Sequence, residues 1–119
     1  MADIRLFDVN GNIVRFTLKH ATTGAPLTGL GSASSGLIVS TICDNEASAT
    51  PYTVAAGNVE TITTLGTFAA PTSGKCRFKE VDATNHPGLY EFQVADARFA
   101  VAGARSLVIT DRPPLGGPG

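Results

Sequence analysis

The chain has 119 residues, which is enough for one domain and too few for a second. Nine Lys and Arg residues against ten Asp and Glu residues give a net charge of −1, which argues against nucleic acid or an anionic membrane surface as a partner. With 43% hydrophobic and 16% charged residues, the sequence is too apolar to be disordered and low in charge for a free monomer, which favours a homo-oligomer or a larger assembly.

Alternation of apolar and polar residues, broken by Gly, Pro, Asn and Asp, predicts an all-β domain. The first two predicted strands, residues 4–9 and 13–19, flank Asn10-Gly11. This dipeptide is a strong signal for a type I′ hairpin turn, because both central residues of that turn need a positive φ. Asn10 and Gly11 are therefore assigned a structural role, and the two strands are expected to pair.

The middle of the chain combines a long connection with two further predicted strand regions. Residues 21–36 are rich in Gly, Ser, Thr and Pro and predict a long loop packed against something, with Leu27 and Leu30 as candidate partner-binding residues. Residues 37–43 are apolar on both faces, which predicts a central strand that is covered on both sides or meets a neighbouring subunit. A second hairpin is expected to follow, with its turn at residues 55–58.

The stretch 85–94 is the most informative part of the sequence. Gly88 ends a predicted turn, and Tyr90 follows in a strand that alternates with Phe92. This pattern matches the tyrosine corner of Greek-key sandwiches, where the ring packs in the core and the hydroxyl bonds back to the turn. Immunoglobulin domains carry a Cys where Phe92 stands, and this chain has no Trp. The sequence thus predicts an Ig-like Greek-key β-sandwich without the Ig disulfide, with Gly88 and Tyr90 as structural residues.

The end of the chain predicts an extended arm. Residues 105–110 form the last predicted strand, so the β-sandwich domain is expected to span residues 1–110. Residues 111–119 contain three Pro and three Gly and can neither pair in a sheet nor form a helix. We expect both termini to dock on neighbouring subunits. The candidate partner-binding residues near the termini are Ile4, Leu6, Arg112, Pro113, Pro114 and Leu115.

No motif in the sequence carries recognisable chemistry. His20 and His86 lie beside turn signals and not beside a Ser or Cys nucleophile, so a small enzyme would need a pocket built around one of them. Cys43 and Cys76 are predicted to be buried free thiols, since the cytosol keeps thiols reduced. Oxygen ligands near residues 44–46 and 82–85 offer only a weak calcium hypothesis. No catalytic, cofactor-binding or metal-binding residue is assigned, and the protein is expected not to be an enzyme.

Four segments resemble a family of small β-sandwich domains from tailed bacteriophages. They are residues 10–18, 44–46, 62–67 and, most clearly, 75–91, and the resemblance extends over about residues 10–110. Domains of this family often open longer tail-fibre or baseplate-like proteins. This chain stops just after its last predicted strand, a layout similar to that of capsid decoration (cement) proteins, which clamp neighbouring capsomers. The resemblance implies no catalytic residues in this chain.

Two functions from different classes follow. The first is a non-enzymatic virion structural protein, a capsid decoration protein that binds the major capsid protein through loop 21–36, one strand edge and both termini. The alternative is a tail-fibre or baseplate module that binds tail subunits or a host-surface glycan, although the loosest aromatic residues for a glycan platform are few: Phe7, Tyr52 and Tyr90. The N-terminus lacks a secretory signal, so we expect synthesis in the host cytoplasm and location in the virion, without cofactor, nucleic acid or membrane.

Overall fold

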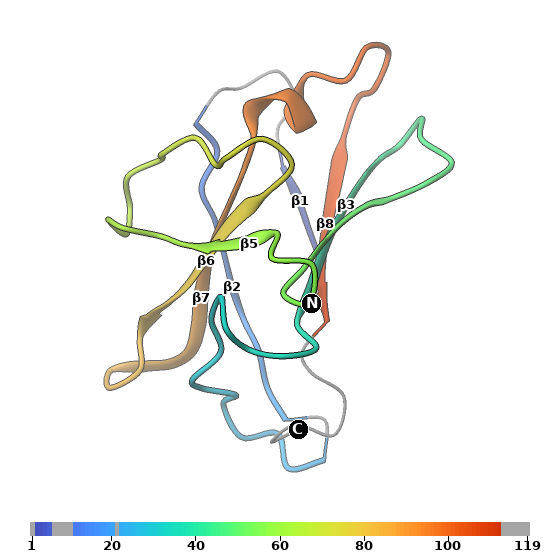
Figure 1. Ribbon diagram of the computed structural model, residues 1–119. Coiled ribbons are helices and arrows are strands. Elements are labelled where there is room, and N and C mark those ends of the chain that lie inside the picture. Colours follow the sequence, from blue (N-terminus) through green and yellow to red (C-terminus); the bar gives the residue numbers. More distant parts are fainter. Residues whose placement is uncertain (1, 6–10, 21, 113–119) are drawn as a thin grey trace.

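The computed structural model describes residues 2–5, 11–20 and 22–112, and within them the chain is all-β, as predicted (Figure 1). The strands are β1 (Ala2–Arg5), β2 (Val14–Thr17), β3 (Ile38–Cys43), β4 (Thr50–Thr53), β5 (Val59–Thr61), β6 (Cys76–Asp82), β7 (His86–Val94) and β8 (Leu107–Arg112). A short 3₁₀ helix, η1 (Asp96–Phe99), joins β7 to β8.

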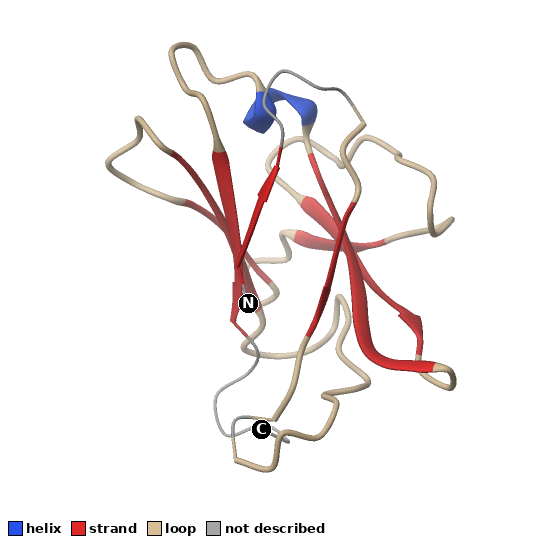
Figure 2. Cartoon of the chain, turned by 180° about the vertical axis from the view of Figure 1, so that it is seen from behind, coloured by secondary structure: helices blue, strands red, loops and turns tan. Residues whose placement is uncertain are grey.

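The strands form two four-stranded sheets that face each other (Figures 1 and 2). Sheet A has the order β1-β8-β3-β4, and sheet B has the order β2-β7-β6-β5. Neighbouring strands are antiparallel, except that β5 and β6 run parallel. A parallel pair cannot be joined by a tight turn, so residues 62–75 form a crossover from β5 to β6.

Alternating residues of the two sheets fill one core between them. In β2, Val14 and Phe16 are buried and Arg15 is exposed, as the period of two in a strand requires. The ring of Phe78 stacks on that of Tyr90, with ring centroids 4.9 Å apart. The buried core residues that come from the two sheets form a single cluster, so the predicted β-sandwich is confirmed.

The second predicted hairpin is wrong, and most of the first lies outside the described residues. Of the first, residues 4 and 5 pair with β8 in sheet A and β2 pairs with β7 in sheet B, so these described parts do not pair with each other, while residues 6–10 are not described. Gly11 has the expected positive φ of 69°, and Asn10 lies outside the described residues. Residues 54–58 likewise connect β4 in sheet A with β5 in sheet B. In a sandwich, each apolar face must be covered by the other sheet, and consecutive strands that cross between sheets achieve this as well as a hairpin does.

The Ig-like Greek-key detail is not confirmed by this strand order. β7 and β8 follow each other in sequence but lie in different sheets, whereas the last two strands of immunoglobulin domains are neighbours in one sheet. β8 runs on to Arg112, so the sheet continues two residues past the predicted domain boundary at residue 110. The predicted arm residues Pro113, Pro114 and Leu115 lie outside the described residues, as does Leu6.

Candidate functional site

Tyr90 holds the long loop 21–36 against the core. Its side chain is fully buried; its hydroxyl donates a hydrogen bond to the carbonyl oxygen of Leu27 at 2.7 Å and accepts one from the backbone N–H of Leu30 at 3.2 Å. The predicted position of the ring in the core is therefore confirmed. The predicted bond from the hydroxyl back to the preceding turn is wrong, because the loop lies closer to the hydroxyl. The turn is closed instead by Asp82, whose carboxylate accepts the backbone N–H groups of Thr84 and Asn85.

Gly88 allows the same loop to lie directly on β7. It has a φ of +85°, and a Cβ there would stand 2.8 Å from the carbonyl oxygen of Leu18 and 3.2 Å from the Cβ of Pro26. Leu27 and Leu30 are 1% and 8% exposed and belong to the protein's own core. In this conformation, their side chains are not available to a partner, although the sequence marked them as candidates for binding one.

The crossover 62–75 covers the outer face of sheet B. Glu91 and Gln93 point away from the core, yet both are fully buried. The two carboxylate oxygens of Glu91 each accept the N–H of Gly66 at 3.0 Å, and Arg15 donates from its Nε to the same carboxylate at 3.0 Å. The side-chain amide of Gln93 donates to the carbonyl oxygen of Thr67 at 3.0 Å. These polar contacts fasten the crossover to the sheet and cover the part of this face around Glu91 and Gln93, while Thr17 on the same face stays exposed.

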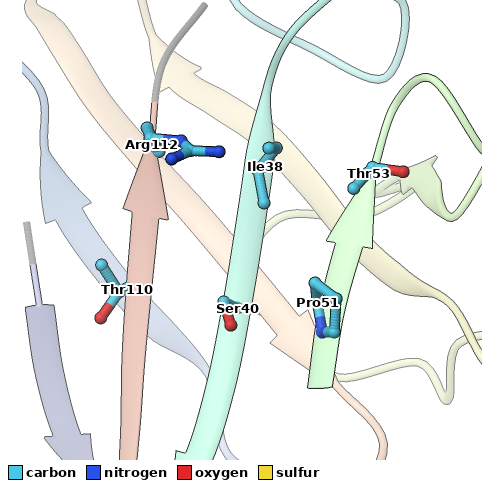
Figure 3. A pocket seen from close by; sticks show the side chains of 6 residues that line it. All are labelled: Ile38, Ser40, Pro51, Thr53, Thr110 and Arg112. Carbon is cyan, nitrogen blue, oxygen red and sulfur yellow. The ribbon is translucent and has the colours of Figure 1, made fainter. Parts of the chain in front are cut away.

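The outer face of sheet A carries no such cover from the described part of the chain (Figures 1 and 2). A pocket of about 460 Å³ lies on it. Six residues of β3, β4 and β8 line this pocket: Ile38, Ser40, Pro51, Thr53, Thr110 and Arg112 (Figure 3). We call this surface the sheet A pocket.

The strand register arranges the sheet A pocket in two rows. Arg112, Ile38 and Thr53 lie side by side across β8, β3 and β4. Thr110, Ser40 and Pro51 form the adjacent row (Figure 3). Arg112 is exposed, is the only charged residue of the six, and forms no ion pair with any described residue. The pocket is thus mostly apolar and hydroxyl-bearing, with one available cation at its rim.

In a second polar cluster, the side chains form hydrogen bonds with one another. The guanidinium of Arg98 in η1 donates to both carboxylate oxygens of Glu46 at 3.1 and 2.6 Å, and its Nε donates to the hydroxyl of Thr41 at 3.0 Å. Glu46 also accepts the backbone N–H of Cys43 at 2.8 Å. The hydrogen bonds from Arg98, followed by that from Cys43, lower the pKa of Glu46 to about 2. This cluster fixes η1 to sheet A and leaves no group free for a ligand.

The remaining candidates for chemistry are dispersed. Cys43 and Cys76 are buried free thiols, as predicted, and burial raises the pKa of both. His86 is exposed at the start of β7, His20 is half-buried, and neither lines the sheet A pocket. Within the described residues, no three His, Cys, Asp or Glu side chains are placed to hold a metal ion. In the same part of the chain, no helix is long and apolar enough to cross a membrane.

Comparisons of the chain with protein-family models, with curated proteins and with solved structures find no match. Its function must therefore be argued from the surfaces described above.

Sequence reasoning identified one residue of the sheet A pocket, Arg112. The apolar residues on both faces of 37–43 predicted a central strand that is covered on both sides or meets a neighbouring subunit. β3 is central in sheet A, and its outward face, which carries Ile38, is not covered by the described residues. The other pocket residues gave no local signal, since their proximity depends on which strands become neighbours. Ile4 lies in β1 opposite Val108, and its side chain is outside the described part of the structure.

Proposed function

We propose that the protein is a non-enzymatic virion structural protein that acts as a capsid decoration protein, binding and stabilising neighbouring capsid subunits. The single observation that supports this most is the asymmetry of the sandwich. The centre of the outer face of sheet B is covered by the chain's own crossover, whereas the outer face of sheet A presents an apolar pocket. The resemblance to small phage β-sandwich domains agrees with this function.

The mechanism is burial of sheet A against a partner. Removing apolar surface from water contributes about 25 cal/mol per Å², so a contact with even one face of a small domain supports binding. Many copies on a symmetrical shell would multiply a modest individual contact through avidity. Each copy that bridges two capsid subunits then opposes their separation.

The contact uses the face of sheet A and not the edge at β4. Pro51 stands in this edge strand and has no backbone N–H to offer an added strand. β3, which carries the centre of the pocket, is already paired on both sides, with β8 and with β4. We therefore propose the sheet face in place of the strand edge that the sequence suggested.

A glycan-binding tail module receives less support. Glycan sites of this kind rely on exposed aromatic rings, and none of the six residues lining the sheet A pocket is aromatic. Tyr52 and Tyr90 are 3% and 0% exposed, and Phe7 lies outside the described residues. A tail or baseplate subunit as the protein partner remains an alternative, which the following experiment separates from the first.

The test is co-sedimentation of the purified chain with expanded capsid shells and, separately, with purified tails of the phage that encodes it. Saturable binding to shells, together with a higher melting temperature of the decorated shells, is the expected result. Binding to tails alone would overturn the decoration function in favour of the tail module. Binding to neither particle would overturn both.

A further inference from the structure

The sheet A pocket also indicates the chemistry of what it binds. We propose that it takes an extended peptide segment of the partner protein, with an apolar side chain seated against Ile38 and Pro51 and a neighbouring carboxylate paired with Arg112. This inference rests on the proposed function, because it names the part of the partner that the same surface recognises.

The dimensions of the pocket fit an extended segment. Neighbouring strands of a sheet lie about 4.8 Å apart, so the three strands β8, β3 and β4 provide a surface about 10 Å wide between their axes. Along β3 the lining extends from Ile38 to Ser40, about 7 Å, which is enough for two or three residues of an extended segment. The pocket volume of about 460 Å³ lies in the range of sites that enclose small ligands.

The two rows of side chains assign a position to each part of the segment. In one row, Arg112 lies directly beside Ile38, so a carboxylate on the segment should be close to its apolar anchor. A guanidinium binds a carboxylate through two parallel hydrogen bonds, which fixes orientation as well as charge. In the other row, the hydroxyls of Ser40 and Thr110 can bond to the segment's polar groups, while Pro51 offers apolar surface.

Charge argues against a second copy of this chain as the occupant. A symmetric dimer through sheet A would place the same surface on both sides of the interface. Among the six residues that line the pocket, none is acidic, so the partner copy's pocket could not supply a carboxylate to Arg112. An acidic and apolar segment from another protein provides the missing complement.

The experiment is selection of a displayed library of random peptides, about twelve residues long, on the immobilised full chain. Enriched peptides should combine aliphatic or aromatic residues with Asp or Glu. Their affinity should fall at least tenfold, about 1.4 kcal/mol, with Ser40→Arg, which fills the pocket, and with Arg112→Glu. Arg112→Lys should keep more of the binding than Arg112→Glu. Thr17→Arg, on the outward face of β2 in sheet B, is the matched control and should leave affinity unchanged.

Several outcomes would overturn the inference. These are the absence of enriched peptides, enriched peptides without acidic residues, or binding that Ser40→Arg and Arg112→Glu leave intact while circular dichroism shows both folded. A wild-type dimer in sedimentation that Ser40→Arg dissociates would identify a second copy as the occupant instead. Failure of shell binding with successful peptide selection would reject the decoration function alone. Shell binding that survives Ser40→Arg would reject the pocket alone.

Discussion

Replacing Tyr90 with Phe should destabilise the domain by about 3 kcal/mol. The ring would keep its place against Phe78, so apolar packing hardly changes. The lost hydroxyl leaves two backbone groups, the carbonyl of Leu27 and the N–H of Leu30, buried without their partner. Each unsatisfied buried group costs about 1–3 kcal/mol, so two cost about 2–6 kcal/mol, and partial adjustment of the loop holds the sum in the lower half of that range. This is a large share of the roughly 5–15 kcal/mol that stabilises a typical domain.

Urea unfolding gives the free energy, and amide hydrogen exchange locates the change. In Tyr90→Phe, the Leu30 amide should lose protection, while amides in the centre of β3 follow global stability only. Tyr52→Phe is the matched control, because Tyr52 is also buried, but among the described residues its hydroxyl forms no hydrogen bond to a backbone group. We expect it to cost less than about 1 kcal/mol. If Tyr90→Phe were as stable as the wild type and the Leu30 amide stayed protected, the anchoring role of this hydroxyl would be refuted.

Three further substitutions test the packing and the charges. Gly88→Ala should lower the free energy of unfolding in urea by more than about 3 kcal/mol, because the added Cβ would clash with the carbonyl oxygen of Leu18 and φ is positive there. Gly24→Ala, also at a positive φ but in open space, should lower it by only about 1 kcal/mol. Equal losses would contradict the close contact at Gly88. Burial raises the pKa of Asp111 to about 6. Because this folded-state value lies above the unfolded one, the contribution of Asp111 to stability falls as pH rises from about 4 to 6. Asp111→Asn should therefore be more stable than the wild type near pH 7 by up to about 3 kcal/mol, with no difference below pH 4. The pKa of Glu46 is lowered to about 2, so Glu46→Gln should melt at a lower temperature than the wild type near pH 7. This difference in melting temperature should disappear as pH falls from about 4.5 to 2. A difference that is independent of pH would rule out the ion pair with Arg98 as its cause.

The sequence predicts local features well where a single strand or residue decides them. Alternation in residues 14–17 correctly places Val14 and Phe16 inside, and the Tyr90 pattern correctly places that ring in the core. The same alternation gives Glu91 an outward position, which is true, but it cannot show that the crossover buries this carboxylate. Alternation along a strand predicts which way a side chain points, but it does not predict which other segment of the chain will cover that side chain.

Sheet membership is the part that sequence reasoning could not supply. Asn10-Gly11 is a strong hairpin signal, but pairing of β1 with β8 places residues 2–5 and 107–110 together across almost the whole chain. The sheet A pocket has the same origin, because Thr110, Ser40 and Pro51 become neighbours only through strand pairing. Contacts between residues so far apart depend on the whole arrangement of apolar faces, which no window of sequence contains.

The most direct test of the central claim, that the outer face of sheet A is the docking surface, is co-sedimentation of three proteins with expanded capsid shells. Wild-type protein and Thr17→Arg should bind with the same saturation curve, whereas Ser40→Arg should bind at least tenfold more weakly while remaining folded. Equal binding by all three would show that the partner contacts another surface of the sandwich and would contradict the claim.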